Sequence, residues 1–154
     1  MPDQPTVKLF YSYSHKDEDL RDQLDTHLKL LQRQKVIDVW HDRKIGAGTE
    51  WKDAIDDNLE AADIILLLIS ADFLASDYCF DVEMRRAMER HEEKSAVVIP
   101  VSLRTCKTNG ADFMKLQGLP KDFKPVKNWP DLDQAFTDIA EGISKAAERI
   151  RAKK

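Results

Sequence analysis

The chain has 154 residues, a length typical of one domain with its own hydrophobic core. Its 28 Asp and Glu against 24 Lys and Arg give a net charge of -4, so no basic field for nucleic acid is expected. The only two cysteines, Cys79 and Cys106, lack the spacing of a disulfide framework or a metal site. We therefore expect one domain over 1–154 with an ordered core at about 6–150, no metal, and a reducing cytoplasm.

No targeting or membrane segment is expected either. Residues 1–6 lack the basic start and apolar stretch of a signal peptide. The longest apolar run, Ile64–Ile69, is far shorter than the roughly 20 residues that span a bilayer.

Segments typical of strands and helices alternate along the chain. Runs rich in β-branched and aromatic residues predict strands, and apolar residues at helical spacing predict helices. The run at 64–69 is continuously apolar, as in a central strand covered on both faces. The other predicted strands are 7–13, 36–40, 96–101 and a short edge strand at 123–127, where Pro125 is tolerated. The predicted helices lie at about 17–33, 51–59, 77–90, 113–116 and 131–150.

This alternation predicts an α/β fold: a flavodoxin-like, doubly wound, five-stranded parallel sheet of order 2-1-3-4-5 with helices on both faces. Such sheets bind ligands at the carboxyl ends of their strands, where the strand order reverses. The segments to examine are therefore 13–17, 42–51 and 70–83. The first has none of the glycines of a phosphate-cradling loop. Tyr13, Ser14 and Ser70 stand where a response-regulator receiver needs acidic residues, which disfavours phosphotransfer.

An acidic residue early in the helix after the central strand stands out. At about 100° per residue, Glu83 lies about 60° from Phe80, on the shoulder of the expected buried stripe. A carboxylate there can be partly desolvated and still face a cleft. The alternative is a surface acid that pairs with Arg86, worth a few tenths of a kcal/mol. The pattern alone favours that alternative.

Four groups of residues extend the interpretation: Phe10–Ser14 with Asp17, Val39–Ile45 leading to Gly48 and Trp51, Ala62–Ser70, and Tyr78–Cys79 with Glu83. In order and spacing they resemble a bacterial TIR (Toll/interleukin receptor) domain, and the resemblance covers nearly the whole chain. Many TIR domains hydrolyse or cyclise NAD+ and release nicotinamide. The resemblance implies that activity here, with NAD+ as the substrate, no separate cofactor, and Glu83 as the catalytic carboxylate.

The resemblance also implies the remaining site residues. Tyr13, Ser14 and His15 match the loop that lines the nucleotide pocket of the family. Asp42, Lys44 and Trp51 match the loop after the second strand, where Trp51 stacks on a flat ring and Lys44 meets a phosphate. Tyr78 and Cys79 precede the glutamate, and Cys79 stands where many members have tryptophan. Structural alternatives remain open: a helix cap for Ser14, a core aromatic for Trp51, a solvated charge for Lys44.

Two functions from different classes follow from this resemblance. The first is an NAD+ glycohydrolase in bacterial defence or cell-suicide signalling, activated by self-association through the loop 42–51. The second is an interaction module that recruits other TIR domains without chemistry. A fused or separate sensor domain is compatible with both.

Overall fold

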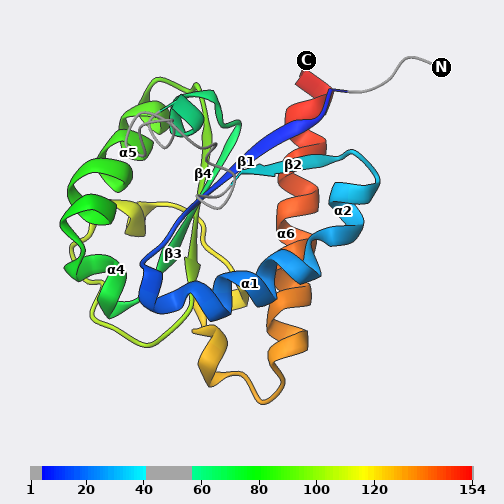
Figure 1. The fold of residues 1–154 in the computed structure, drawn as a ribbon. Coiled ribbons are helices and arrows are strands. Elements are labelled where there is room, and N and C mark those ends of the chain that lie inside the picture. Colours follow the sequence, from blue (N-terminus) through cyan, green and yellow to red (C-terminus); the bar gives the residue numbers. More distant parts are fainter. Residues whose placement is uncertain (1–4, 41–56, 154) are drawn as a thin grey trace, which may run out of the picture.

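The computed structural model describes residues 5–40 and 57–153, which form a parallel sheet with helices packed against it (Figure 1). The strands are β1 Val7–Ser12, β2 Ile37–Trp40, β3 Ile64–Ile69 and β4 Val97–Ser102. Their order is β2-β1-β3-β4, and every pair is parallel. Four of the five predicted strands are confirmed to within one residue at each end, and the order predicted for these four is confirmed.

Helices cover both faces of the sheet, α1 and α6 on one side and α4 and α5 on the other (Figure 1). The faces alternate along β1, because successive side chains of a strand point in opposite directions. Val7, Leu9 and Tyr11 pack with α1 and α6, whereas Phe10 packs with the helices that follow β3. All six side chains of β3 are buried, as expected for a strand covered on both sides.

The helices agree broadly with the apolar periodicity of the sequence. The α-helices are α1 Glu18–His27, α2 Lys29–Arg33, α4 Ala71–Ala75, α5 Arg85–Glu92 and α6 Leu132–Lys153, and residues 57–61 are also helical. The 3-10 helices are η1 His15–Asp17, η4 Asp112–Lys115, η5 Lys121–Phe123 and η6 Val126–Asn128. A π-helix, η3 Asp77–Met84, runs directly into α5.

The predicted edge strand at 123–127 is wrong. η5 and η6 occupy this stretch, and Phe123 has a φ of 55°, which is incompatible with an extended strand. Beyond β4 a single parallel bridge joins Val101 to Leu119. Leu119 donates a backbone hydrogen bond to Pro100 and accepts one from Ser102, each 2.9 Å long. In the described part of the chain the sheet therefore has four strands, not five, because the chain after β4 pairs with the sheet only at Leu119, next to Pro120.

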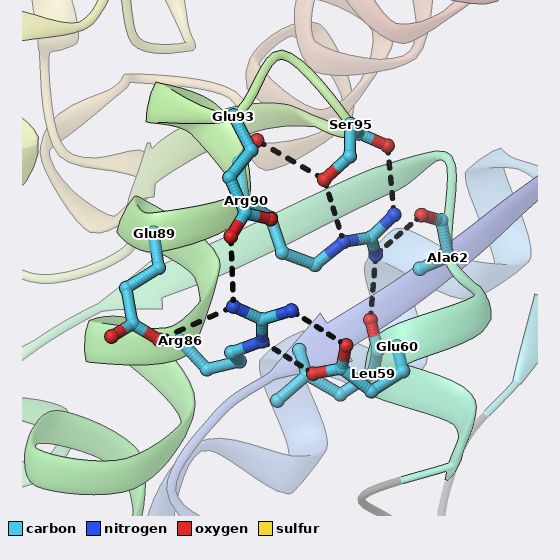
Figure 2. Close-up of polar contacts among 8 residues, drawn as sticks. All are labelled: Leu59, Glu60, Ala62, Arg86, Glu89, Arg90, Glu93 and Ser95. Atoms are coloured by element: carbon cyan, nitrogen blue, oxygen red, sulfur yellow. Dashed lines mark hydrogen bonds and ion pairs between the residues drawn. The ribbon is translucent and has the colours of Figure 1, made fainter.

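Two arginines of α5 tie it to the helical residues 57–61 (Figure 2). Arg90 is buried, and its guanidinium donates to the carbonyl oxygens of Leu59 at 2.8 Å, Ala62 at 2.7 Å and Ser95 at 2.7 Å. These carbonyls lie where helical hydrogen bonding ends, so the arginine supplies the missing donors. The arrangement fixes the helix that carries η3 relative to the start of β3.

Candidate functional site

The predicted glutamate lies in the π-helix η3, which is capped by Ser76. The Ser76 hydroxyl accepts a hydrogen bond from the backbone N–H of Cys79 at 3.1 Å. The wider turn of η3 alters the geometry expected for an α-helix: Glu83 is only 5% exposed, beside the buried Met84, while Phe80 is only partly buried. The expected shoulder position is therefore corrected to a buried one. π-turns within helices are frequent at functional sites.

The Glu83 carboxylate reaches the end of the first strand. The Ser12 hydroxyl donates to Glu83 Oε1 at 2.8 Å, and Ser12 is 0% exposed. A buried carboxylate needs such donors, because its desolvation otherwise favours the protonated form. The interpretation of Glu83 as a surface acid is therefore wrong. Arg86, its suggested partner, contacts Glu60 at 2.5 and 2.8 Å as well as Glu89 (Figure 2).

A cavity of about 260 Å³ opens at the carboxyl end of β1, beside Glu83. This is the place predicted from the strand order, where the connections from β1 and β3 diverge. This volume is slightly below that of typical ligand pockets, which range from about 300 to 1,000 Å³. Its lining is mainly aromatic: Phe10, Tyr11, Tyr13, Ser14, His15, Lys16, Trp40, Ser76, Tyr78, Cys79 and Glu83.

The structure brings together six of the nine predicted site residues around this cavity: Tyr13, Ser14, His15, Tyr78, Cys79 and Glu83. Asp42, Lys44 and Trp51 lie outside the described residues. Sequence analysis did not assign Phe10, Tyr11, Lys16, Trp40 or Ser76 to the site. Lys16 and Ser76 lie within the predicted segments 13–17 and 70–83. Trp40 lies outside these segments and reaches the cavity because it is the register partner of Phe10.

The Cys79 thiol faces the first loop across the cavity wall. It donates a hydrogen bond to the carbonyl oxygen of Tyr13 at 3.2 Å. Burial, reinforced by the nearby carboxylates of Glu83 and Asp17, raises the pKa of Cys79 to about 12. The thiol is thus neutral at physiological pH, which makes it a poor nucleophile and a packing group of the site.

Asp17 anchors the loop that carries the cavity residues. Its buried carboxylate accepts hydrogen bonds from the Ser70 hydroxyl and from Arg104 Nε, the latter at 2.7 Å. Arg104 also contacts Asp72 at 2.5 Å. The loops after β1, β3 and β4 therefore meet at one charged cluster. In the first of these loops, the Ser14 hydroxyl accepts a hydrogen bond from the N–H of Lys16 and so caps η1.

A buried cation, the Arg21 guanidinium, packs against the rings of Tyr11 and Tyr13 in the cavity wall. The Arg21 guanidinium lies 5.7 Å from the Tyr11 ring centroid and 5.1 Å from that of Tyr13. Tyr11 donates to Asp25 at 3.1 Å, and burial raises the pKa of Tyr11 well above its usual value. His15 meets the Tyr13 ring edge-on at 6.0 Å. These contacts hold the aromatic wall in place from behind.

Two features are absent from residues 5–40 and 57–153. Within these ranges, no set of three or more His, Cys, Asp or Glu side chains is arranged to bind a metal ion. No helix in the same part of the chain has the length and apolar character to cross a bilayer.

The parallel sheet with helices on both faces and a polar loop cluster at its carboxyl edge is an α/β TIR fold. A family model described as "TIR domain" matches residues 9–145, and the chain belongs to that family. A solved structure, the TIR domain of the Toll-related receptor TRR-2 from Hydra magnipapillata, is similar with a TM-score of 0.54 and 18% sequence identity. The match covers 74% of this chain and 85% of that one, and it supports the fold alone.

Two curated proteins are similar in sequence. The uncharacterized protein y4lF of Sinorhizobium fredii is 56% identical over 142 residues, which is 92% of this chain and 44% of that protein. The disease resistance protein RPP2B of Arabidopsis thaliana is 28% identical over 96 residues, 62% of this chain and 8% of that protein. The chain thus spans less than half the length of either relative.

Proposed function

We propose that this TIR domain cleaves NAD+ at the bond between nicotinamide and ribose, with Glu83 as the catalytic carboxylate. The observation that carries the proposal is the environment of Glu83. Its side chain is buried, receives the Ser12 hydroxyl at 2.8 Å, and lines a largely aromatic cavity. A buried carboxylate beside a cavity is typical of a group that acts on developing positive charge.

The chemistry requires little beyond this carboxylate. The glycosidic C–N bond breaks with its electron pair going to the pyridinium nitrogen, so nicotinamide leaves neutral and no general acid is needed. The ribose carbon develops oxocarbenium character, which a nearby anion stabilises. Water then adds to that carbon and loses a proton, giving ADP-ribose. Capture by an adenine nitrogen instead gives a cyclic product.

Other residues supply binding surface in this proposal. Tyr13, Ser14 and His15 form the loop wall, and Lys16 adds a cation suited to the pyrophosphate. Tyr78 and Cys79 line the side that carries Glu83. Asp42, Lys44 and Trp51 are proposed to complete the site from the loop after β2.

TIR domains generally self-associate, and we propose that assembly through the loop 42–51 activates the enzyme in a cytoplasmic defence or cell-suicide response. The second candidate, a scaffold without chemistry, gains support from the similarity to a disease resistance protein. The partial coverage of y4lF is compatible with a sensor domain elsewhere in a longer chain.

Nicotinamide release from NAD+ by the purified protein, measured free and concentrated on beads, tests both candidates. We expect turnover in the parent and its loss, by at least about 100-fold, in Glu83→Gln. Glu89→Gln is the matched control, since Glu89 is an exposed acid two turns along the same helical segment. Assemblies that form without any turnover would favour the scaffold, and equal activity in Glu83→Gln would remove the site assignment.

A further inference from the structure

Trp40 ends the second strand with one ring face already occupied. It is the register partner of Phe10 on β1, and the two rings stack at 5.5 Å between centroids with 6° between their planes. Phe10 is buried in the core between β1 and the helices that follow β3, so it is a fixed support. Trp40 is only partly buried and lines the cavity. The stacking contact with Phe10 therefore fixes the orientation of a flat indole ring in the cavity wall.

Three of the other aromatic side chains of the wall are less suited to receive a ligand ring. Phe10 and Tyr11 are almost completely buried. The Tyr13 ring already has the Arg21 guanidinium at 5.1 Å and the edge of His15 at 6.0 Å. Trp40 combines a partly exposed ring with an orientation set by stacking, which lowers the entropic cost of binding.

The strand geometry places Trp40 close to the residue that binds the Glu83 carboxylate. Phe10 and Ser12 point to the same face of β1, and Ser12 holds Glu83. Trp40 lies across from Phe10, so a step of one strand and two residues, about 8 Å, separates its backbone from that of Ser12. That distance is comparable to the length of a six-membered ring joined to a sugar. A ring against Trp40 would bring the attached sugar toward Glu83.

We propose that Trp40 is the stacking residue for the cationic pyridinium ring of the substrate, and that it selects for the charged ring over a neutral one. The inference rests on the proposed NAD+ cleavage. Tryptophan has the strongest cation–π attraction among aromatic side chains, and the ring of NAD+ carries its charge until the glycosidic bond breaks. The neutral nicotinamide that results binds the indole more weakly, which favours its release.

The test is fluorine NMR on the full chain labelled with 5-fluorotryptophan. Trp40, Trp51 and Trp129 give three resonances, each assigned by its own Trp→Phe variant. The probes are 1-methylnicotinamide, a permanent pyridinium cation, with neutral nicotinamide and ADP-ribose as comparisons. We expect a saturable shift of the Trp40 resonance with 1-methylnicotinamide, at a concentration about 3- to 30-fold lower than nicotinamide requires.

Kinetics on NAD+ give a second measurement. Trp40→Leu should raise KM by about 3- to 30-fold while Trp40→Phe changes it less, with urea midpoints recorded to verify folding. A Trp40 resonance that moves only with ADP-ribose, or does not move with the cation, overturns the inference, as does equal KM in well-folded Trp40→Leu. Because the NMR experiment needs no turnover, a Trp40 shift without nicotinamide release would leave the ring site standing and remove only the proposed activity.

Discussion

The hydroxyl of Ser12, the last residue of β1, donates a 2.8 Å hydrogen bond to Glu83 on η3, 71 residues further along the chain. Both side chains are buried. The bond joins the central region of the sheet to the helix after β3 at the edge of the cavity. It orients one carboxylate oxygen and stabilises the ionised form of the group.

Ser12→Ala tests this relationship. Without the hydroxyl the carboxylate is protonated more readily, so the loss of NAD+ cleavage on acidification should begin at a higher pH than in the parent. The value of kcat/KM at neutral pH should fall about tenfold or more, the usual effect of losing a hydrogen bond to a charged group. Ser102→Ala, at another buried serine that ends a strand, should leave the pH profile unchanged. An unshifted profile in Ser12→Ala would contradict the positioning role.

The cluster around Asp17 should contribute measurably to stability. Arg104→Leu removes the guanidinium from a buried carboxylate, and we expect the free energy of unfolding to fall by about 1–3 kcal/mol. Urea denaturation should show a lower midpoint with an unchanged slope. Arg85→Leu removes an exposed arginine 4.0 Å from Asp81 and should cost less than about 0.5 kcal/mol. Equal losses in the two variants would show that the cluster has no special role.

Arg90 and Arg86 offer a matched comparison four residues apart (Figure 2). Arg90→Leu leaves three carbonyl oxygens without their donor, and we expect a loss of about 2–4 kcal/mol. Arg86→Leu breaks a partly exposed ion pair with Glu60 and should cost less than about 1 kcal/mol. Repeating the unfolding in 1 M NaCl should shrink the effect of Arg86→Leu only, because salt screens exposed charges. If 1 M NaCl also reduced the loss of stability caused by Arg90→Leu, that result would argue against the burial of Arg90.

The Cys79 thiol should resist alkylation in the folded protein. Raising its pKa from 9.0 to about 12 lowers the thiolate fraction at pH 8 about 1,000-fold. In a Cys106→Ala background, mass spectrometry should show iodoacetamide reacting with the folded chain slower by about that factor than with the urea-unfolded chain. Similar rates in both states would indicate an accessible, ionised thiol and reopen a nucleophilic role.

Much of the fold was predictable from local pattern. The continuous apolar run of β3 and the alternating helices specified a parallel sheet, and the strand order predicted a ligand site at the carboxyl edge of β1 and β3, where the structure has a cavity. The predicted edge strand failed because backbone conformation at Asp122 and Phe123, with φ of 60° and 55°, is not encoded by hydrophobicity. Periodicity likewise assumed an α-helix where η3 is a π-helix.

By itself the sequence determined the alternation of elements, the family resemblance and the candidate glutamate, because these depend on local patterns, short motifs and the order of those motifs along the chain. Only the tertiary structure decided that Glu83 is buried against Ser12, that Asp17 joins Ser70 and Arg104, and that Trp40 stacks on Phe10. Each of these contacts joins side chains at least 30 residues apart. They exist because strand register and helix packing bring distant segments to one edge of the sheet, which no local pattern can specify.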